Sequence, residues 1–517
     1  MGWNKMGRSQ GWKGVKRMVD RPPDNTLVRA FDKGVNAVLD PRSVAVIGAS
    51  STFGKWGQLI MSNIVAGRFQ GKVFPVNPGK ETVYGLPAYE DIRNIPDDVD
   101  LAFITIPSET VPAILEACGE KGVKAVVLIT SGYREIGEEG RRLERDMVDI
   151  CRKLGLLLVG PNTMGIIRPY VSLFATGSHT RPREGNVAFV AQSGNLGVQL
   201  IRWAEQQGIG ISLFVGSGNE AMANSTDYLE ALENDPHTGI ITLYVESVGD
   251  GRRFMEVAGR IARKKPIILL KGGRTEPGRM AAVSHTGSMS GEDSFFRAAC
   301  SQTGVLNVRM PSELLDLSAG FSSLPLPRGN RVGIVTNGGG WGVVTADECS
   351  EKGLEVPDIP EHIIEIMDEY LPPFWSRGNP LDLVGTRDRT VPLVAVEELL
   401  KWDGIDAVIS LAFIGRHGLT RSLIRSIGDI DSSASPEFLG QLDKSGLEFE
   451  KEYIARIAEL MELYEKPVIG VSLTKTDEGT VRPVAGRRYN GVFYETPEDA
   501  VNVLARMAAY RQFLDRG

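Results

Sequence analysis

The sequence of 517 residues has little cysteine, and its four cysteines are scattered singly along the chain. They are Cys118, Cys151, Cys300 and Cys349, and no two of them have the CxxC spacing of a zinc or redox site. The spacing therefore indicates neither a disulfide framework nor a metal site built on thiolates, and we expect no bound metal. A chain of this kind fits the reducing cytoplasm.

The sequence also lacks a long hydrophobic run and an excess of basic charge. No apolar stretch reaches the roughly 18 residues that a membrane-spanning helix needs, so we expect no membrane partner. The net charge of −7 argues against nucleic acid as a partner. Basic residues do alternate with tryptophan and methionine near the N-terminus, without the continuous apolar segment of a secretory signal. We interpret residues 1–40 as an extension, either a terminal segment or a basic arm that contacts a partner.

Apolar runs alternate with helical segments from Pro41 onward. The runs that are apolar enough for buried strands lie at 43–47, 73–77, 100–106, 125–130 and 156–159. This alternation predicts an α/β fold with a parallel, doubly wound sheet, whose ligand lies at the carboxyl ends of the strands. We assign residues 41–168 to this first, Rossmann-like domain.

A glycine-rich turn at 48–57 follows the first strand and precedes a helix predicted at 58–67. Five residues separate Gly48 from Gly54, which fails the dinucleotide fingerprint and is one residue too long for a Walker A loop. Trp56 also stands where a Walker A loop has Ser or Thr. Because backbone amides at a helix N-terminus suit phosphate, we expect a phosphate-rich ligand at this turn.

Two residues, one at the end of the second predicted strand and one shortly after it, favour one ligand over another. Asn77 stands where a carboxylate would hold the ribose of NAD, and Lys80 is placed to pair with an extra ribose phosphate, as in coenzyme A. We therefore favour CoA. An oxidoreductase that binds NAD, or a Rossmann-like domain with another ligand, stays an alternative.

Two later segments repeat one another at a constant offset. Asn186–Gly197 aligns with Arg331–Gly342, and further matches follow at the same offset. An internal duplication of a flavodoxin-like domain accounts for the repeat. We assign the two copies to residues 169–325 and 326–517. The second copy also carries a charged insertion at about 415–452, which we expect to form extra helices.

The segment with the strongest candidate for a catalytic residue follows the strand predicted at 266–270. Lys271–Gly291 is rich in Gly, Ser and Thr, so we expect a loop there, with His285 on it. A histidine can be a covalent nucleophile, most usefully when a carboxylate fixes its ring through the other nitrogen. Glu246 ends a predicted strand on the same edge and is the candidate for that carboxylate. An ordinary loop histidine and a strand-end acid facing solvent are the alternatives.

Several motifs occur in the order in which a known family has them. They are Val46–Ser50, Pro75–Pro78, Gly160–Gly165, Gln192–Gly197, Lys271–Thr275, Ser284–Gly287 and Asn379–Asp382. On these motifs the chain resembles the α subunit of NDP-forming acyl-CoA synthetases, the ADP-forming acetate:CoA ligase group of the succinyl-CoA synthetase superfamily. A non-catalytic protein that binds CoA or acyl-CoA for regulation, built on the same domains, is the alternative.

The resemblance implies a reaction and a partner. His285 would accept a phosphoryl group from an acyl phosphate, made from acyl-CoA and phosphate, and pass it to ADP, with Glu246 holding the histidine. The reverse direction makes acyl-CoA from a small carboxylic acid, ATP and CoA. Relatives fused into one chain carry an ATP-grasp domain, and nothing in this sequence resembles one. We therefore expect ATP or ADP and Mg²⁺ to bind to an ATP-grasp β subunit, in an α2β2 assembly.

The expected contacts fall into three groups. The phosphate site consists of a helix start and the surroundings of the histidine: Ser193, Gly194, Asn195, Ser284, Thr286 and Gly287. The expected CoA contacts follow the strands of the first domain: Gly48, Ala49, Ser50, Phe53, Gly54, Asn77, Lys80, Ile106, Pro107, Ser108, Ser131 and Gly132. The expected substrate contacts are Asn162 and Thr163.

Overall fold

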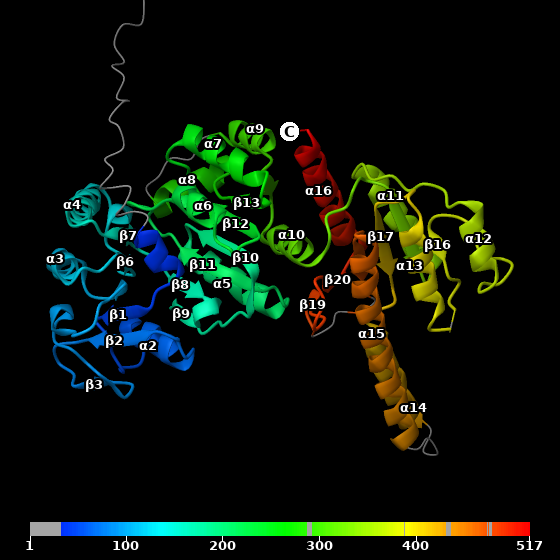
Figure 1. The fold of residues 1–517 in the computed structure, drawn as a ribbon, viewed down its shortest axis with the longest axis horizontal. Helices are drawn as coiled ribbons and strands as arrows, with labels where there is room; N and C mark the ends of the chain where they lie inside the picture. The colour runs from blue at the N-terminus through cyan, green and yellow to red at the C-terminus, as the bar shows by residue number, and fades with distance from the viewer. Residues whose placement is uncertain are drawn as a thin grey trace, which may run out of the picture.

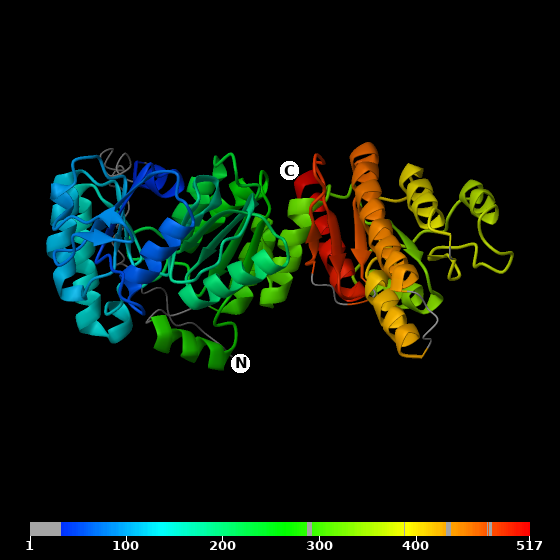
Figure 2. The same cartoon turned by 90° about the horizontal axis from the view of Figure 1, so that it is seen from below.

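The computed structural model describes residues 33–286, 292–386, 388–430, 436–472, 474 and 478–516. Three mostly parallel sheets follow one another along the long axis of the molecule, with helices packed against them (Figures 1 and 2). The expected α/β class is therefore confirmed. Most of the expected extension at 1–40 lies outside the described residues, which begin with a helix at 33–39.

The first sheet has five parallel strands in the order β2-β1-β5-β6-β7. Its strands are β1 (Ser43–Ile47), β2 (Lys72–Val76), β5 (Leu101–Ile104), β6 (Ala125–Leu128) and β7 (Leu157–Val159). Its helices are α2 (Trp56–Ala66), α3 (Val111–Lys121), α4 (Glu138–Leu154) and the short η1 (Ile92–Asn94), η2 (Ser108–Thr110) and η3 (Arg134–Ile136), with a small hairpin of β3 (Thr82–Val83) and β4 (Leu86–Pro87). Four of the five strands are buried along their whole length, which explains why they are continuous apolar runs.

The chain leaves β1 for β2 on one side and returns to β5 on the other. The carboxyl ends of β1 and β5 therefore form a topological switch point, the place where open α/β sheets bind ligands. The helix expected at 58–67 begins two residues earlier, at Trp56. The other expected elements of this domain agree with the structure to within about two residues.

The second sheet has the order β14-β13-β12-β10-β11-β8-β9. Its strands are β8 (Gly165–Arg168), β9 (Leu173–Thr176), β10 (Glu184–Ala191), β11 (Ile211–Gly216), β12 (Ile240–Val245), β13 (Ile267–Lys271) and β14 (Leu306–Val308). Its helices are α5 (Gly194–Gln206), α6 (Ser225–Glu233), α7 (Gly251–Ala262), α8 (Glu276–Thr286), α9 (Asp293–Thr303) and α10 (Pro311–Ser323), with the short η4 (Pro169–Val171). The β8–β9 hairpin pairs antiparallel with β11, so the division drawn at residue 168 falls inside a hairpin of this sheet.

The third sheet has the order β16-β15-β17-β18-β20-β19. Its strands are β15 (Val332–Thr336), β16 (Leu381–Asp382), β17 (Ala407–Leu411), β18 (Val468–Val471), β19 (Val481–Arg482) and β20 (Gly491–Tyr494). Its helices are α11 (Gly339–Glu351), α12 (Glu361–Asp368), α13 (Val391–Lys401), α14 (Arg416–Ile430), α15 (Pro436–Tyr464) and α16 (Pro497–Asp515). In both the second and third sheets the first parallel strand lies between the second and the third, and the fourth and fifth follow outward, which supports the duplication.

The charged insertion forms helices, as expected. Helices α14 and α15 pack against each other and project from the third sheet as an arm (Figure 1). The second half of α15 returns to the core, where Tyr453 and Ile457 are fully buried. Within the described part of the chain, no helix has both the length and the apolar character needed to cross a bilayer.

The C-terminal helix joins the third sheet to the second. The hydroxyl of Tyr510 donates to the carbonyl oxygen of Ala262 at 2.6 Å. A Cβ placed on Gly304 would lie 2.3 Å from the ring of Phe513, so the helix end packs directly on that glycine. Helix α16 also packs along α10, which makes the two helices the junction between the sheets.

Asp316 on α10 gives this junction a pH dependence. Burial, with the nearby charges of Asp499, Glu313 and Glu495, raises the pKa of the Asp316 carboxyl to about 7. The folded chain therefore binds more protons than the unfolded chain between about pH 4 and pH 7, and the free energy of unfolding falls as the pH rises through that range.

The substitution D316N removes this acid, so it should flatten the pH profile of the unfolding midpoint. It should also stabilise the chain at pH 8 by about 1–2 kcal/mol, less than the full shift implies. Thermal unfolding from pH 5 to pH 8 measures both effects, with D358N at an exposed aspartate as the control. An unchanged slope in D316N would contradict this role.

Candidate functional site

The turns that carry the expected CoA contacts lie at the carboxyl edge of the first sheet. Gly48 leaves β1 with φ 87°, and its amide donates to the carbonyl oxygen of Val76 at 3.0 Å. The side-chain amide of Asn77 donates to the carbonyl oxygen of Ala49 at 2.7 Å. Through this bond Asn77 fixes the glycine-rich turn. An amide therefore occupies the position at which a dinucleotide site has a carboxylate that binds the ribose.

The glycine-rich turn approaches the sheet closely at a residue that the sequence did not single out. A Cβ placed on Gly57 would lie 1.9 Å from the carbonyl oxygen of Gly48, so only glycine allows α2 to start there. The first amides of α2 therefore lie at the switch point, where helix geometry leaves them without partners inside the helix. Phe53, in the same turn, is 94% exposed.

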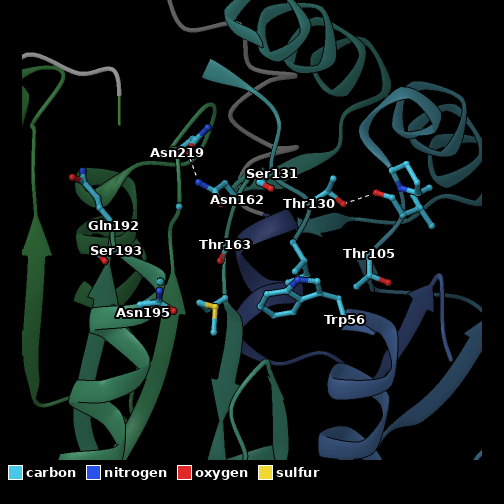
Figure 3. A pocket seen from close by; sticks show the side chains of 16 residues that line it. Trp56, Thr105, Thr130, Ser131, Asn162, Thr163, Gln192, Ser193, Asn195 and Asn219 are labelled. Atoms are coloured by element: carbon cyan, nitrogen blue, oxygen red, sulfur yellow. Dashed lines mark hydrogen bonds between the residues drawn. The ribbon is translucent and has the colours of Figure 1, made fainter. Parts of the chain in front are cut away.

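A pocket of about 480 Å³ lies between the first and second sheets (Figure 3). Its described lining residues are Trp56, Thr105, Ile106, Pro107, Ile129, Thr130, Ser131, Asn162, Thr163, Met164, Gln192, Ser193, Gly194, Asn195, Gly218 and Asn219. The expected residues in this set are Ile106, Pro107, Ser131, Asn162, Thr163, Ser193, Gly194 and Asn195. The expected CoA contacts outside it are Gly48, Ala49, Ser50, Phe53, Gly54, Asn77, Lys80, Ser108 and Gly132.

The turn between β7 and β8 forms the part of the pocket between the two sheets. It contains a cis peptide bond between Gly160 and Pro161. Asn162 follows with φ 57°, and its side-chain amide donates to the Oδ1 of Asn219 at 3.4 Å, a bond drawn in Figure 3. The hydroxyl of Thr163 is buried and donates to the carbonyl oxygen of Gly216. Both expected substrate contacts are therefore held by bonds to the end of β11 and the loop that follows it.

Helix α5 points its N-terminus into the pocket. Ser193 is its N-cap residue, yet the serine side chain makes no capping hydrogen bond, and Ser193 lines the pocket. Met164 packs against the first residue, because a Cβ on Gly194 would lie 2.3 Å from the Cγ of Met164. The first-turn amides and the positive end of the helix dipole suit an anion at this place.

Asn219 joins the two sides of the pocket through a pair of acids that the sequence did not reveal. Its side-chain amide donates to Glu135 at 2.8 Å and to Glu144 at 2.9 Å, both from the first domain. Burial alone would raise the pKa of Glu135, but hydrogen bonds from Asn219 and from backbone amides hold it below its ordinary value. Burial raises the pKa of Glu144, against the effect of Asn219 and Arg134.

Gln192, at the end of β10, fixes the segment that carries Glu246. Its Oε1 accepts from the backbone amides of Glu246 at 2.6 Å and of Ser247 at 3.1 Å. Its amide donates to the carboxylate of Glu220 at 2.9 Å and to the carbonyl oxygen of Ser247 at 2.8 Å. Burial raises the pKa of the Glu220 carboxyl. Gln192 and its partners lie in three different loops, after β10, β11 and β12, so sequence spacing gave no sign of the cluster.

The carboxylate of Glu246 is 6% exposed and directly follows β12. Its Oε1 accepts from the hydroxyl of Tyr244 at 3.3 Å, while its buried Oε2 has no partner among the described residues. The ammonium of Lys271 is buried beside it and donates to the carbonyl oxygen of Glu246 at 3.0 Å, and burial lowers the pKa of Lys271. The site therefore offers a buried carboxylate oxygen that lacks a donor.

The expectation of a loop around His285 is wrong for its backbone, which lies in the last turn of α8. The helix forms because Pro277 sits in its first turn, where a missing amide hydrogen costs nothing, and Ala281 and Ala282 favour helix. The stretch after the helix, including Gly287, lies outside the described residues. So do the side chains of Ser284, His285 and Thr286, and with them the expected contact with Glu246.

Helix α8 links the two parts of the site. It starts a few residues after Lys271, and a Cβ placed on Gly272 in between would lie 3.3 Å from the Cγ of Glu246. At the same time α8 contacts η3 of the first domain, the segment that contains Glu135. The segment from Gly272 through α8 therefore runs from beside Glu246 to the first domain, and its helix carries His285.

Three family models match successive parts of the chain. The CoA binding domain matches residues 42–169, the succinyl-CoA ligase like flavodoxin domain matches 184–321, and the ligase-CoA domain matches 332–412. The first match contains the whole first sheet, the second contains the parallel strands β10 to β14 of the second sheet, and the third contains β15, β16 and β17 of the third sheet.

Known proteins of one kind are similar over most of the chain. The α subunit of ADP-forming acetate–CoA ligase I from Pyrococcus furiosus is 44% identical over 68% of this chain and 77% of its own. ADP-forming acetate–CoA ligase I from Archaeoglobus fulgidus is 38% identical over 72% of this chain, which is only 54% of its own length. The solved structure of dinucleotide forming acetyl-coenzyme A synthetase 1 from Ca. Korarchaeum cryptofilum, in complex with phosphate and ADP, has a TM-score of 0.79 and 31% identity, covering 94% of this chain and 99% of that one.

Proposed function

The chain belongs to the family of ADP-forming acetate–CoA ligase α subunits, and on that premise we propose that it interconverts acyl-CoA, ADP and phosphate with a carboxylic acid, ATP and CoA. We assign CoA binding to residues 41–168, phosphoryl transfer through His285 to residues 169–325, and a third, flavodoxin-like domain to residues 326–517. The observation that carries the proposal is the buried Oε2 of Glu246, which lacks a donor beside the segment that leads to His285.

In the first step, phosphate reacts with acyl-CoA in the pocket. CoA lies along the carboxyl edge of the first sheet, with its phosphates at the start of α2 and its thiol end in the pocket. An oxygen of phosphate, held by the first amides of α5, attacks the acyl carbonyl carbon. The carbon–sulfur bond breaks, CoA leaves as the thiolate, and an acyl phosphate remains.

The second step moves the phosphoryl group to the protein. One ring nitrogen of His285 attacks the phosphorus atom, the bond from phosphorus to the acyl oxygen breaks, and the carboxylate leaves. The hydrogen on the other ring nitrogen is donated to the Oε2 of Glu246, which stabilises the positive charge that forms on the ring. An oxygen of ADP then attacks the phosphorus, the bond to His285 breaks, and ATP forms.

The nucleotide step involves a second subunit. Relatives of this chain are named α subunits, and a related single-chain enzyme is about twice as long as the region that it shares with this chain. We propose an ATP-grasp β subunit that holds ATP or ADP with Mg²⁺, in an α2β2 assembly. The segment from Gly272 through α8, whose helix contacts η3, would carry His285 between the two sites. We propose the cytoplasm as the location, since all four cysteines are buried free thiols.

Ligand binding to the chain tests the CoA assignment. CoA should raise the thermal unfolding midpoint, with about 2.7 kcal/mol of stabilisation at a hundredfold excess over its Kd, whereas NAD should not. K80A should weaken CoA by about tenfold, because Lys80 is assigned to the ribose phosphate, and should leave dephospho-CoA unchanged. Stabilisation by NAD alone, or an equal loss for CoA and dephospho-CoA in K80A, would contradict these assignments. Binding of CoA by a chain that supports no turnover with its β subunit would favour the regulatory alternative.

A further inference from the structure

The side chain of Gln192 lines the pocket, yet its hydrogen-bonding capacity is used up inside the protein. Its Oε1 accepts from the backbone amides of Glu246 and Ser247, and its Nε2 donates to the Glu220 carboxylate and to the carbonyl oxygen of Ser247. A glutamine amide has two hydrogens to donate and two lone pairs that accept. All four are engaged, so Gln192 holds the segment of Glu246 rather than a ligand.

The two ends of this carboxamide cannot be exchanged. If the group turned over, its NH2 would face the two backbone amides, and its oxygen would face the Glu220 carboxylate and the Ser247 carbonyl. Each of the four contacts would become repulsive. Among these partners only Glu220 is an acid, and a hydrogen bond to an ionised group is about twice as strong as one between neutral groups. Glu220 therefore has the largest single influence on the direction in which Gln192 points.

Glu220 is itself held from behind. It lies in the loop between β11 and α6, and its Oε1 accepts from the hydroxyls of Ser217 at 2.8 Å and Ser225 at 2.5 Å. These bonds leave Oε2 for Gln192. Glu220 is not among the described residues that line the pocket, so its carboxylate supports Gln192 without facing a ligand.

The backbone of Glu220 has a conformation that favours glycine. Its φ of 53° lies in the left-handed region, which is strained for a residue with a Cβ. Strain of this kind is found mainly where the surrounding structure enforces it, and it gathers at functional sites. A glycine would fit the backbone better, which indicates that the carboxylate has a role of its own.

We propose that Glu220 is a positioning residue for phosphoryl transfer: it fixes the orientation of Gln192, and Gln192 in turn places Glu246 to serve His285. The inference rests on the proposed function, since it concerns the acid assigned to His285. Glu220 touches neither the substrate nor the reacting atoms and acts through two hydrogen-bonded neighbours.

Steady-state kinetics of the complex with its β subunit tests the inference. E220G removes the carboxylate and suits the left-handed backbone, so the chain should fold. This variant should lower kcat about tenfold and leave the KM for CoA within about twofold, because a displaced Glu246 stabilises the imidazolium less well. E220Q keeps an acceptor for Gln192, and its kcat should lie between those of E220G and the parent.

The matched control is E465G, at a glutamate of the third domain. Glu465 also has a left-handed backbone, with φ 50°, and its carboxylate accepts from the hydroxyl of Tyr489 at 2.8 Å. E465G therefore makes the same change in backbone and side chain away from the site, and its kcat should equal that of the parent.

A double-mutant cycle shows whether Glu220 acts through Glu246. In the E246Q background, E220G should lower kcat by less than about threefold further, because the carboxylate that Glu220 helps to place is already absent. A full tenfold further loss would mean that Glu220 acts independently of Glu246, and it would overturn the inference.

Two other results would also contradict the role of Glu220. They are an unchanged kcat in E220G, and a kcat in E220Q no higher than in E220G. Absence of turnover in the parent complex would overturn the proposed function, whereas turnover that E220G leaves unchanged overturns only the inference. If E220G does not fold, E220M, which keeps the length of the side chain without its oxygens, takes its place in the same cycle.

Discussion

H285N should abolish ADP-forming turnover with the β subunit while leaving CoA binding within about twofold of the parent. Asparagine has no ring nitrogen that can form a bond to phosphorus, so the route from acyl phosphate to ADP is lost. A loss of at least about 10⁴-fold in kcat, or about 5.5 kcal/mol in the barrier, is expected when a covalent nucleophile is removed.

The control for H285N is H362N, at an exposed histidine of α12 in the third domain. This variant should keep full turnover. Substantial turnover in H285N, with the protein folded and CoA bound, would mean that the phosphoryl group reaches ADP without this histidine.

E246Q should lower kcat by about 10²–10³-fold and change the KM for CoA little. Glutamine preserves the shape of the side chain and an acceptor for the hydroxyl of Tyr244, but it lacks the negative charge that would stabilise the imidazolium of His285. Because Glu246 does not line the pocket, its loss should affect phosphoryl transfer rather than CoA binding.

Steady-state kinetics of the complex separate kcat from KM, and E256Q, at an exposed glutamate of α7, is the matched control. A structural role alone would lower the unfolding midpoint of E246Q without a selective effect on kcat. A rise in the KM for CoA with kcat unchanged would place Glu246 at the CoA site and contradict its assignment to the histidine.

The architecture could be predicted because a parallel strand that is buried on both faces appears in the sequence as a continuous apolar run. Apart from Ser43, the residues of β1, β5 and β6 are apolar, and glycine or proline follows within four residues of each strand and indicates a turn. The duplication could be seen because both copies keep the glycine positions at the start of α5 and α11. The resemblance to the family indicated Glu246, and its position at a strand end agrees, since the carboxyl ends of parallel strands meet at one edge.

What the sequence did not reveal depends on contacts between distant segments. Gln192 and Asn219 were not assigned to the site, because their partners lie on other loops. Trp56 counted only as a departure from a nucleotide motif, and its place in the pocket depends on how α2 packs against Gly177. The prediction of a loop at His285 was wrong because it gave more weight to the Gly, Ser and Thr content than to the alanines that extend α8.

The site combines positions that one domain alone does not provide. In the proposed site the first sheet would hold CoA and α5 would hold the anion, and Asn219 joins the two domains through Glu135 and Glu144. The segment from Gly272 through α8 lies beside Glu246 at its start and contacts η3 through the helix. The arrangement suits a carrier that collects a phosphoryl group at the pocket and delivers it elsewhere.

The central claim, that His285 carries the phosphoryl group, is tested most directly by phosphorylation. The chain is incubated with radiolabelled acetyl phosphate, and the position of the label is mapped by peptide mass spectrometry under alkaline conditions, where phosphohistidine survives. We predict one acid-labile phosphate per chain, on His285, which is lost when ADP and the β subunit are added. An acid-stable label, a label on another residue, or full labelling of H285N would contradict the account.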